Sequence, residues 1–501
     1  MKNKIAITIL LCLICDSLSS QSWIIDYRGD YPSGRTHFNS GFVDEDGVTF
    51  LAGVQGPGHE SHETLLMRIE PNGEHQETVY HKDGFISEAH CIIETDDHHL
   101  FVAGRIYDEN DDDVMILLFD KDLRLLSESR YSKEVEAINF DQCNATLDAH
   151  GNIIVASGVK MNNSYGGTVT RGVFYKFNRQ GELLCYRYLT EDYPDPVYYL
   201  MRFRIRQMWY REEDETLLCL TPGSNGGMAF VTFDSAFNYL EEYPIWRETD
   251  DTSFEHTLNH DCYTDHWISE DEALFFSSRG DYDHNKLRIS QVNTRGEFTK
   301  FIQLNERPDT IDDAATRRCM ATANDSTFYF SFYEHPTCCI PGTAVVYLLN
   351  EKMEIIGRHI DEQHDAFRSY LIFPTSDGGC ITVNDSCDLG VFTHFGHPKI
   401  TKLRREDFET VHLNVMPIPR EGVGAFPNPT EQTLFIPLNE RSLNRLRCRI
   451  IDLHGRVVID QIVPANQDLL FLDVSLLKKG TYVYRIYTSD STTLSGKFTK
   501  K

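Results

Sequence analysis

Residues 114–131, VMILLFDKDLRLLSESRY, form the segment that decides the fold. An apolar run that begins at Val114 is followed by a short polar turn at residues 120–123 and then by a second strand-like run that ends at Tyr131. Two such runs joined by a short polar turn predict a β-hairpin. This hairpin is the unit from which the rest of the sequence is built.

The same pattern occurs seven times. The turns begin at Glu70, Asp120, Asn178, Asp234, Asn293, Asn350 and Arg405, and are 50, 58, 56, 59, 57 and 55 residues apart. A second signature precedes each hairpin, for example DEDGVTFLAG from Asp44 and TDDHHLFVAG from Thr95, so that each repeat offers four strands. A strand-rich repeat of about 50 residues is typical of propeller blades. We expect an all-β fold with a seven-bladed β-propeller over residues 21–415; an array of β-sandwiches does not require seven even repeats.

Both ends of the predicted propeller carry a distinct segment. Residues 1–20 have two lysines, an apolar run from Ile5 to Cys15 and then small residues, the pattern of a cleaved signal peptide. No later stretch is apolar for long enough to predict a membrane span in the mature chain. The segment Trp23–Ile25 is an apolar strand ahead of the first full repeat, which we expect to pair near the outer strand of the last blade and to close the ring.

Residues 416–425 are rich in Pro and Gly and predict a linker, after which residues 426–501 show short alternating strands typical of a small Ig-like β-sandwich. This tail carries an ordered series of short motifs: Pro427-Asn428-Pro429, Asp452 with Gly455, Gly480 with Tyr482, and Gly496-Lys497 near the end. In this series it resembles the C-terminal sorting domain of type IX secretion (Por secretion) cargo of Bacteroidetes. The resemblance implies contact with the type IX secretion machinery and a secreted protein, or one at the outer-membrane surface of a Gram-negative bacterium.

The composition limits the partners. The formal net charge is −28, with 76 acidic against 48 basic residues, so that the surface repels nucleic acid. Thirteen cysteines are present, eleven of them after residue 20, an odd number for an exported chain. Cys380 and Cys387 flank a hairpin-like segment, and the adjacent Cys338 and Cys339 lie one repeat earlier, so that disulfides in the last blades are expected without a defined pairing. Cys91, Cys143 and Cys319 recur at one repeat position, which indicates small buried residues.

Candidate ligand-binding residues lie where the innermost strands begin, at the mouth of the predicted channel. They are His90, Arg206, Asp261, Arg318 and Arg368. Arginine pairs well with carboxylates and sulfates, which makes an acidic glycan one candidate ligand. The alternative is that these polar side chains only satisfy loop carbonyls and one another.

Metal-binding patterns are weak. His256, His260 and Asp261 form the densest cluster of ligand-type residues, but a loop does not fix them on one face. The acidic run 108–113 has ligands for Ca²⁺ without the spacing of a known calcium loop, and it also fits an exposed hairpin tip. No other cofactor is indicated.

Three functional classes remain open from the sequence. The first is a non-catalytic binding or interaction module that contacts a glycan or a surface protein, for which no catalytic residues are assigned. The second is a secreted glycan-degrading enzyme, a lyase or glycosidase, with its site at the channel mouth. The third is a structural component of the cell surface, which would carry apolar side chains on its blade edges.

Overall fold

The computed structural model describes residues 21–501 with gaps. The gaps are 30–34, 59–60, 110–111, 133–136, 163–167, 190–204, 206, 223–227, 245–261, 270–271, 280–285, 296–297, 305–310, 315–319, 323–326, 336–341, 352–353, 387–396, 411–424, 426–427, 438–445, 453–455, 464–468 and 488–491. The predicted signal peptide, residues 1–20, lies outside the described residues, and in some strands only the backbone is described.

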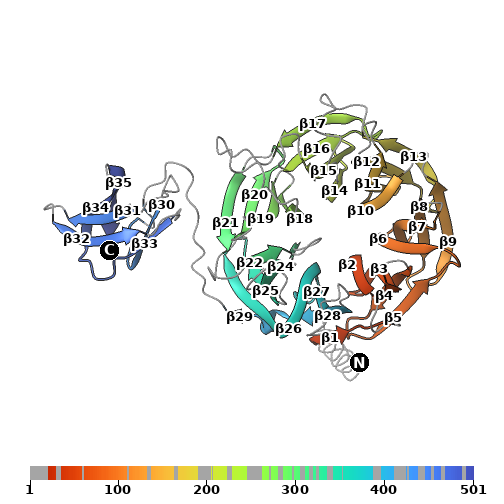
Figure 1. Cartoon of the computed structure of the whole chain (residues 1–501), viewed down its shortest axis with the longest axis horizontal. Helices are drawn as coiled ribbons and strands as arrows, with labels where there is room; N and C mark the ends of the chain where they lie inside the picture. Colours follow the sequence, from red (N-terminus) through yellow and green to blue (C-terminus); the bar gives the residue numbers. More distant parts are fainter. Residues whose placement is uncertain are drawn as a thin grey trace, which may run out of the picture. The chain divides into compact units, whose positions relative to one another are not determined.

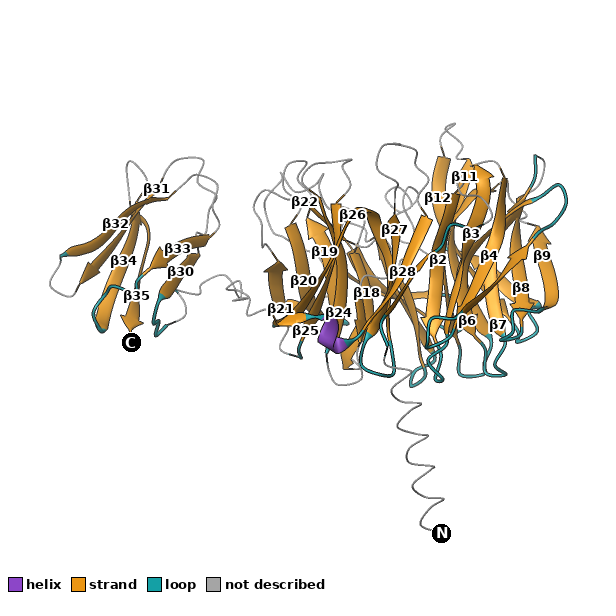
Figure 2. Cartoon of the chain, turned by 90° about the horizontal axis from the view of Figure 1, so that it is seen from below, coloured by secondary structure: helices purple, strands orange, loops and turns teal. Residues whose placement is uncertain are grey.

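The chain divides into two compact units, residues 1–415 and 416–501. Nearly all described secondary structure is β-strand, and the one helical turn in the described part is η2 (Arg405–Asp407) (Figure 2). The predicted all-β class is therefore confirmed.

The N-terminal unit has five separate four-stranded antiparallel sheets among its described residues, each built from consecutive strands. The first contains β2 (Arg35–Val43), β3 (Thr49–Gly58), β4 (Ser61–Ile69) and β5 (His75–Tyr80). The second contains β6 (Ile86–Glu94), β7 (Leu100–Tyr107), β8 (Asp112–Phe119) and β9 (Leu125–Ser132). The third contains β10 (Ala137–Leu147), β11 (Ile153–Asn162), β12 (Thr168–Phe177) and β13 (Leu183–Tyr188). The fourth contains β14 (Gln207–Arg211), β15 (Thr216–Pro222), β16 (Met228–Phe233) and β17 (Tyr239–Pro244). The fifth contains β18 (Cys262–Ser269), β19 (Glu272–Arg279), β20 (Lys286–Asn293) and β21 (Phe298–Leu304).

The remaining strands of this unit form one nine-stranded sheet, in which β26 is shared. Its strands are β1 (Trp23–Asp26), β22 (Ile311–Ala314), β23 (Met320–Thr322), β24 (Phe328–His335), β25 (Gly342–Leu349), β26 (Ile355–Pro374), β27 (Cys380–Ser386), β28 (His397–Leu403) and β29 (Glu409–Thr410). The first part of β26 pairs with β25, and its last part, from Ala366, pairs with β27. Figure 1 shows the sheets of this unit arranged in a ring, with β2, β6, β10, β14 and β18 nearest the centre. This arrangement is propeller-like.

The hairpin turns form because their first residue satisfies the local backbone. Asp120 Oδ1 accepts hydrogen bonds from the backbone N–H of Asp122, at 2.9 Å, and of Arg124, at 2.8 Å. Leu123 adopts a positive φ of 60° with its side chain buried. An aspartate that bonds to the backbone two residues ahead favours a turn over a continued strand. The predicted hairpin at residues 114–131 is therefore confirmed as β8 and β9.

The apolar runs are continuous because both faces of each middle strand are covered. In β7, Leu100 and Val102 pack in the core layer between the first and second sheets. Phe101 and Ala103, pointing to the opposite face, pack in the layer between the second and third sheets. Successive side chains of a strand alternate between faces, so that a strand buried on both sides needs no polar alternation.

The predicted pairing of Trp23–Ile25 is confirmed. β1 pairs antiparallel with β28, where Ile25 lies opposite Ile400. The predicted return strand after Arg405 is wrong. The chain there forms η2, and β29 pairs with β26 instead of β28. The physical reason is Phe408, which is buried against Tyr329 and draws the chain toward the neighbouring strands.

The C-terminal unit consists of two small antiparallel sheets. One sheet contains β30 (Thr433–Pro437) and β33 (Leu469–Asp473), and the other has the order β32 (Val457–Val463), β31 (Leu446–Asp452), β34 (Gly480–Tyr487) and β35 (Thr492–Lys500). Leu434 and Leu472 from the first sheet share one apolar core with Ile450, Tyr484 and Phe498 from the second.

In the described part of the chain, no helix has the length and apolar character needed to span a membrane.

Candidate functional site

The innermost strands carry a repeated irregularity near their beginnings, where we expected the site. The register of pairing shifts between Phe38 and Ser40 in β2, between Ala89 and Cys91 in β6, and between Asp141 and Cys143 in β10. A β-bulge of this kind redirects the side chain at the extra residue. The extra residues in the first two strands are the polar Asn39 and His90.

A glycine on the second strand makes room for the bulges of β2 and β6. A Cβ atom added to Gly104 would lie 2.0 Å from the carbonyl oxygen of Glu88, and one added to Gly53 would lie 2.0 Å from that of His37. These glycines end the repeated LAG and VAG signatures of the sequence. The signature therefore specifies close approach of the innermost strand, which in turn positions His90.

Polar side chains of one innermost strand bind the backbone of the next. Asn39 Nδ2 donates to the carbonyl oxygen of Ala89 at 2.6 Å, and Ser40 Oγ accepts from the N–H of Ile92 at 3.2 Å. Asn144 Nδ2 donates to the carbonyl oxygen of Ile205 at 2.9 Å. These contacts hold neighbouring sheets together. They agree with the alternative stated above, in which polar side chains at the channel mouth satisfy groups of the protein itself.

Glu88 is the centre of a charged cluster between the first and second sheets. His62 Nδ1 lies 3.1 Å from Glu88 Oε1, and His90 Nε2 lies 3.5 Å from Glu88 Oε2. The side chains of His62, His90 and Glu88 are 2, 10 and 19% exposed. Arg105 stands directly opposite Glu88 in the register of β6 and β7. Its guanidinium carbon lies 3.8 Å from the ring centre of Tyr107.

Burial alone would raise the pKa of the Glu88 carboxyl, but the hydrogen bond with His62, the neighbouring His90 and the positive charge of Arg105 lower it by more. The pKa of Glu88 is consequently far below its ordinary value. An ionised carboxylate only accepts hydrogen bonds, so His62 Nδ1 is the donor in this contact. Glu88 is thus a fixed anion and not a proton donor near neutral pH.

The structure describes one of the five predicted ligand-binding side chains. His90 lies beside Glu88 as given above, and Arg368 is placed by its backbone alone, paired with Asp385. Arg206, Asp261 and Arg318 lie outside the described residues. The predicted ring of charged side chains therefore stays a prediction.

The described residues give no support to the weak metal-binding candidates. His256, His260 and Asp261 lie outside the described residues. Asp112 and Asp113 of the acidic run begin β8, where they pair with Tyr107 and Ile106 at the end of β7. Among the described residues, no group of three or more His, Cys, Asp or Glu side chains is arranged to hold a metal ion.

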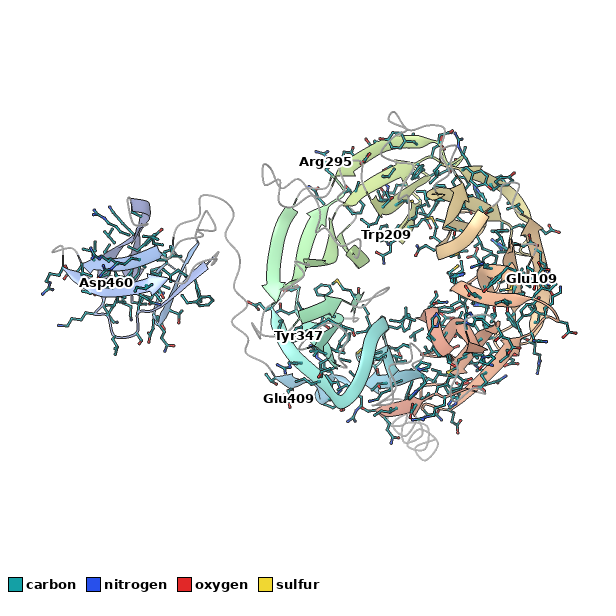
Figure 3. The ribbon with its side chains drawn as sticks, viewed as in Figure 1. Glu109, Trp209, Arg295, Tyr347, Glu409 and Asp460 are labelled. Carbon is teal, nitrogen blue, oxygen red and sulfur yellow. The ribbon has the colours of Figure 1, made fainter. Side chains whose placement is uncertain are left out.

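Sequence reasoning missed Glu88 as the partner of His90, and His62 and Arg105 as further neighbours of Glu88. The sequence holds 76 acidic residues, and no spacing singles out Glu88 among them. Trp209 was also missed; it is half-buried on the innermost strand β14, at the inner side of the ring (Figure 3). The signal that could have found Glu88 is the pair of polar residues that flank Ala89 at a predicted strand start.

In the C-terminal unit, the described motif residues serve the fold. Asn428 Oδ1 accepts from the N–H of Thr499 at 2.9 Å, next to the cis peptide bond that precedes Pro429. Asp452 Oδ1, at the end of β31, accepts from the N–H of Arg456 at 2.9 Å. The Tyr482 ring stacks on Phe498. Gly480 begins β34, Gly496 and Lys497 lie within β35, and Pro427 and Gly455 lie outside the described residues.

Residues 424–501 match the model of a family described as a secretion system C-terminal sorting domain. The match ends at the last residue and lies within the C-terminal unit. It supports export by the type IX secretion system, and with it a secreted or cell-surface location. No curated protein matches the sequence.

Solved structures similar to the chain include three of particular interest. The polysaccharide lyase Uly1 has a TM-score of 0.45 at 10% identity, with 78% of this chain and 95% of that chain covered. The NanB sialidase from Streptococcus pneumoniae has a TM-score of 0.41 at 8% identity, with coverage of 77% and 71%. The β-propeller domain of the Trilobed protease from Pyrococcus furiosus has a TM-score of 0.39 at 10% identity, with coverage of 75% and 97%.

Proposed function

We propose that the protein is a seven-bladed β-propeller that the type IX system exports to the outer surface of a Gram-negative bacterium of the Bacteroidetes, where it acts as a binding module. The propeller comprises residues 21–415, residues 416–425 are a linker, and residues 426–501 form a β-sandwich sorting domain. The observation that carries the proposal is the match of residues 424–501 to a sorting domain, because it supports export to the cell surface or beyond.

The pairing of β26 supports seven blades. Strands β22 to β25 with the first part of β26 make a sixth blade, and the last part of β26 with β27, β28 and β1 makes a seventh. The N-terminal strand β1 then closes the ring by supplying the outermost strand of the last blade. Closure by a strand from the other end of the chain removes an exposed sheet edge.

The rigid mouth of the channel supports a binding role. Asn39 and Asn144 are fixed by hydrogen bonds to the backbone of the following sheet, and Glu88 is fixed as a carboxylate. Side chains held in place before a ligand arrives lose little entropy when it binds. We propose that such a mouth, with Arg206, Arg318 and Arg368 added, binds a glycan that carries carboxylate or sulfate groups.

A structural component of the cell surface, the third functional class, would carry apolar side chains on the outermost strands. Leu126, Leu184 and Leu240 are each about half exposed and occupy one repeat position on β9, β13 and β17. The outermost strand of each of these sheets carries one or two exposed large apolar side chains, and scattered apolar residues of this kind are normal on a surface. They therefore give no preference for a structural surface component over a binding module.

A glycan-array and polysaccharide-degradation screen of the purified full chain, with and without Ca²⁺, tests the proposal. Binding of acidic glycans without release of products is the expected result. Arg206→Ala should weaken this binding, whereas Arg124→Ala, at an exposed position of the β8–β9 turn, should not. Release of products would replace the binding role with that of a glycan-degrading enzyme. Silence in both assays would direct the search to protein partners.

A further inference from the structure

Two buried thiols meet between the second and third sheets. The Sγ atoms of Cys91 and Cys143 lie 3.1 Å apart, and the two residues are 3 and 8% exposed. Cys91 is on β6 and Cys143 is on β10, the innermost strands of adjacent sheets. The sequence predicted that both are small buried residues, and this is confirmed.

The bulges bring these two side chains together. Each cysteine directly follows the register shift of its strand, one after Ala89 and the other after Asp141. Both side chains therefore enter the same apolar layer, where they pack with Val114 and Val155. The contact is a consequence of the repeat, since the same local geometry recurs 52 residues later.

The surroundings fit a covalent link better than a reactive thiol. Burial, together with the neighbouring Cys91, raises the pKa of the Cys143 thiol well above its ordinary value. A thiol in apolar surroundings without a positive neighbour is a poor nucleophile and a poor metal ligand. Two sulfur atoms in a disulfide are about 2.05 Å apart, so rotation of the side chains has to close about 1 Å.

We propose that Cys91 and Cys143 form a disulfide bond in the exported protein. The inference rests on the proposed export, because disulfides form and persist in oxidising compartments. Two S–H bonds break and one S–S bond forms. The two electrons and two protons pass to the disulfide of a thiol oxidoreductase of that compartment, which becomes a dithiol. The reaction occurs during folding, before the two side chains are buried.

The bond joins the innermost strands of two neighbouring sheets covalently. It lies one residue beyond His90, so that it also fixes the bulge that places His90 beside Glu88. The bond thereby contributes to the rigidity of the channel mouth.

Peptide mapping of the full chain tests the bond directly. The protein is refolded in a glutathione redox buffer, unfolded in denaturant with iodoacetamide and without reductant, and digested for mass spectrometry. We expect a peptide pair linked through Cys91 and Cys143 that disappears when reductant is added before digestion. Recovery of both cysteines in separately alkylated peptides, or linked to other cysteines, would overturn the proposal.

Thermal unfolding gives a second measurement. A bond that encloses a 52-residue segment constrains the unfolded chain, and its reduction should lower the Tm of wild type by about 5 °C. Cys91→Ala combined with Cys143→Ala should abolish this response to reductant. Cys219→Ala, which removes a buried thiol of β15, should retain it. A wild-type Tm that is the same with and without reductant would also overturn the proposal. Since refolded protein is used, failure of the bond is distinguishable from failure of export in cells.

Discussion

Trp23 Nε1 donates a hydrogen bond to the carbonyl oxygen of Pro71 at 3.1 Å, and through it the N-terminal strand β1 reaches the hairpin turn of the first sheet. The same relation recurs between consecutive sheets, where a side chain of the outermost strand donates to a carbonyl of the following hairpin turn. These contacts join Gln76 to Asp122, Tyr131 to Gly181 and Arg187 to Ala236. Trp23 therefore joins β1 to the first sheet through the same kind of contact that joins these three other pairs of neighbouring sheets.

We expect Gly73→Ala to weaken this closure. A Cβ atom at Gly73 would lie 2.8 Å from Cγ of the Trp23 ring, and the residue has a φ of 90°, which disfavours any side chain. Strain at a positive φ alone costs roughly 1 kcal/mol. Gly84→Ala is the matched control, because its φ is 78° and nothing lies within 4 Å of the added atom. Chemical denaturation should show a larger loss for Gly73→Ala; equal losses would contradict a role of Trp23.

We expect the Tyr131 hydroxyl to contribute more to the free energy of unfolding than a surface hydroxyl does. It donates to the carbonyl oxygen of Gly181 at 2.9 Å and accepts from the N–H of Leu183 at 3.1 Å. Tyr131→Phe leaves both backbone groups without this partner, which we expect to cost about 1–3 kcal/mol of unfolding free energy. Tyr243→Phe, which removes a hydroxyl bound to the surface residue Glu241, serves as the control and should cost little. Urea unfolding followed by tyrosine fluorescence measures both.

The hairpins could be predicted from the sequence because their determinants are local. The carboxylate of Asp120 bonds to the backbone within four residues, so its turn is independent of the rest of the fold. The Glu88 cluster could not be predicted, since His62 comes from a different sheet and the position of His90 beside Glu88 depends on a bulge. The prediction of a return strand after Arg405 was wrong for a similar reason, because the burial of Phe408 against Tyr329 depends on tertiary packing.

Glu88 should make stability depend on pH in the acid range. Its folded pKa is below the ordinary value of 4.5, so its contribution is complete above pH 4.5 and is lost as the pH falls further below that value. Glu88→Gln should lower the unfolding free energy at pH 7 by about 1–3 kcal/mol, and the difference from wild type should shrink on acidification. Glu77→Gln, at an exposed position of β5, is the control. A difference that is independent of pH between 3 and 7 would show that Glu88 acts through packing alone.

A substitution that disturbs the core of the C-terminal unit should unfold this unit and block export, while the N-terminal unit remains folded. A Cβ atom at Gly496 would lie 2.3 Å from the hydroxyl oxygen of Tyr484, whose ring is buried in the shared core of the C-terminal unit. Because the ring is enclosed, it has no room to move aside, and Gly496→Val should unfold this small domain. We expect the variant to accumulate inside the cell envelope with a circular dichroism spectrum and Tm of the propeller like those of wild type. Thr499→Ala, which changes an exposed side chain of β35 and keeps the backbone bond to Asn428, should be exported normally. Normal surface delivery of Gly496→Val, measured by protease accessibility on intact cells, would show that export does not require the folded tail.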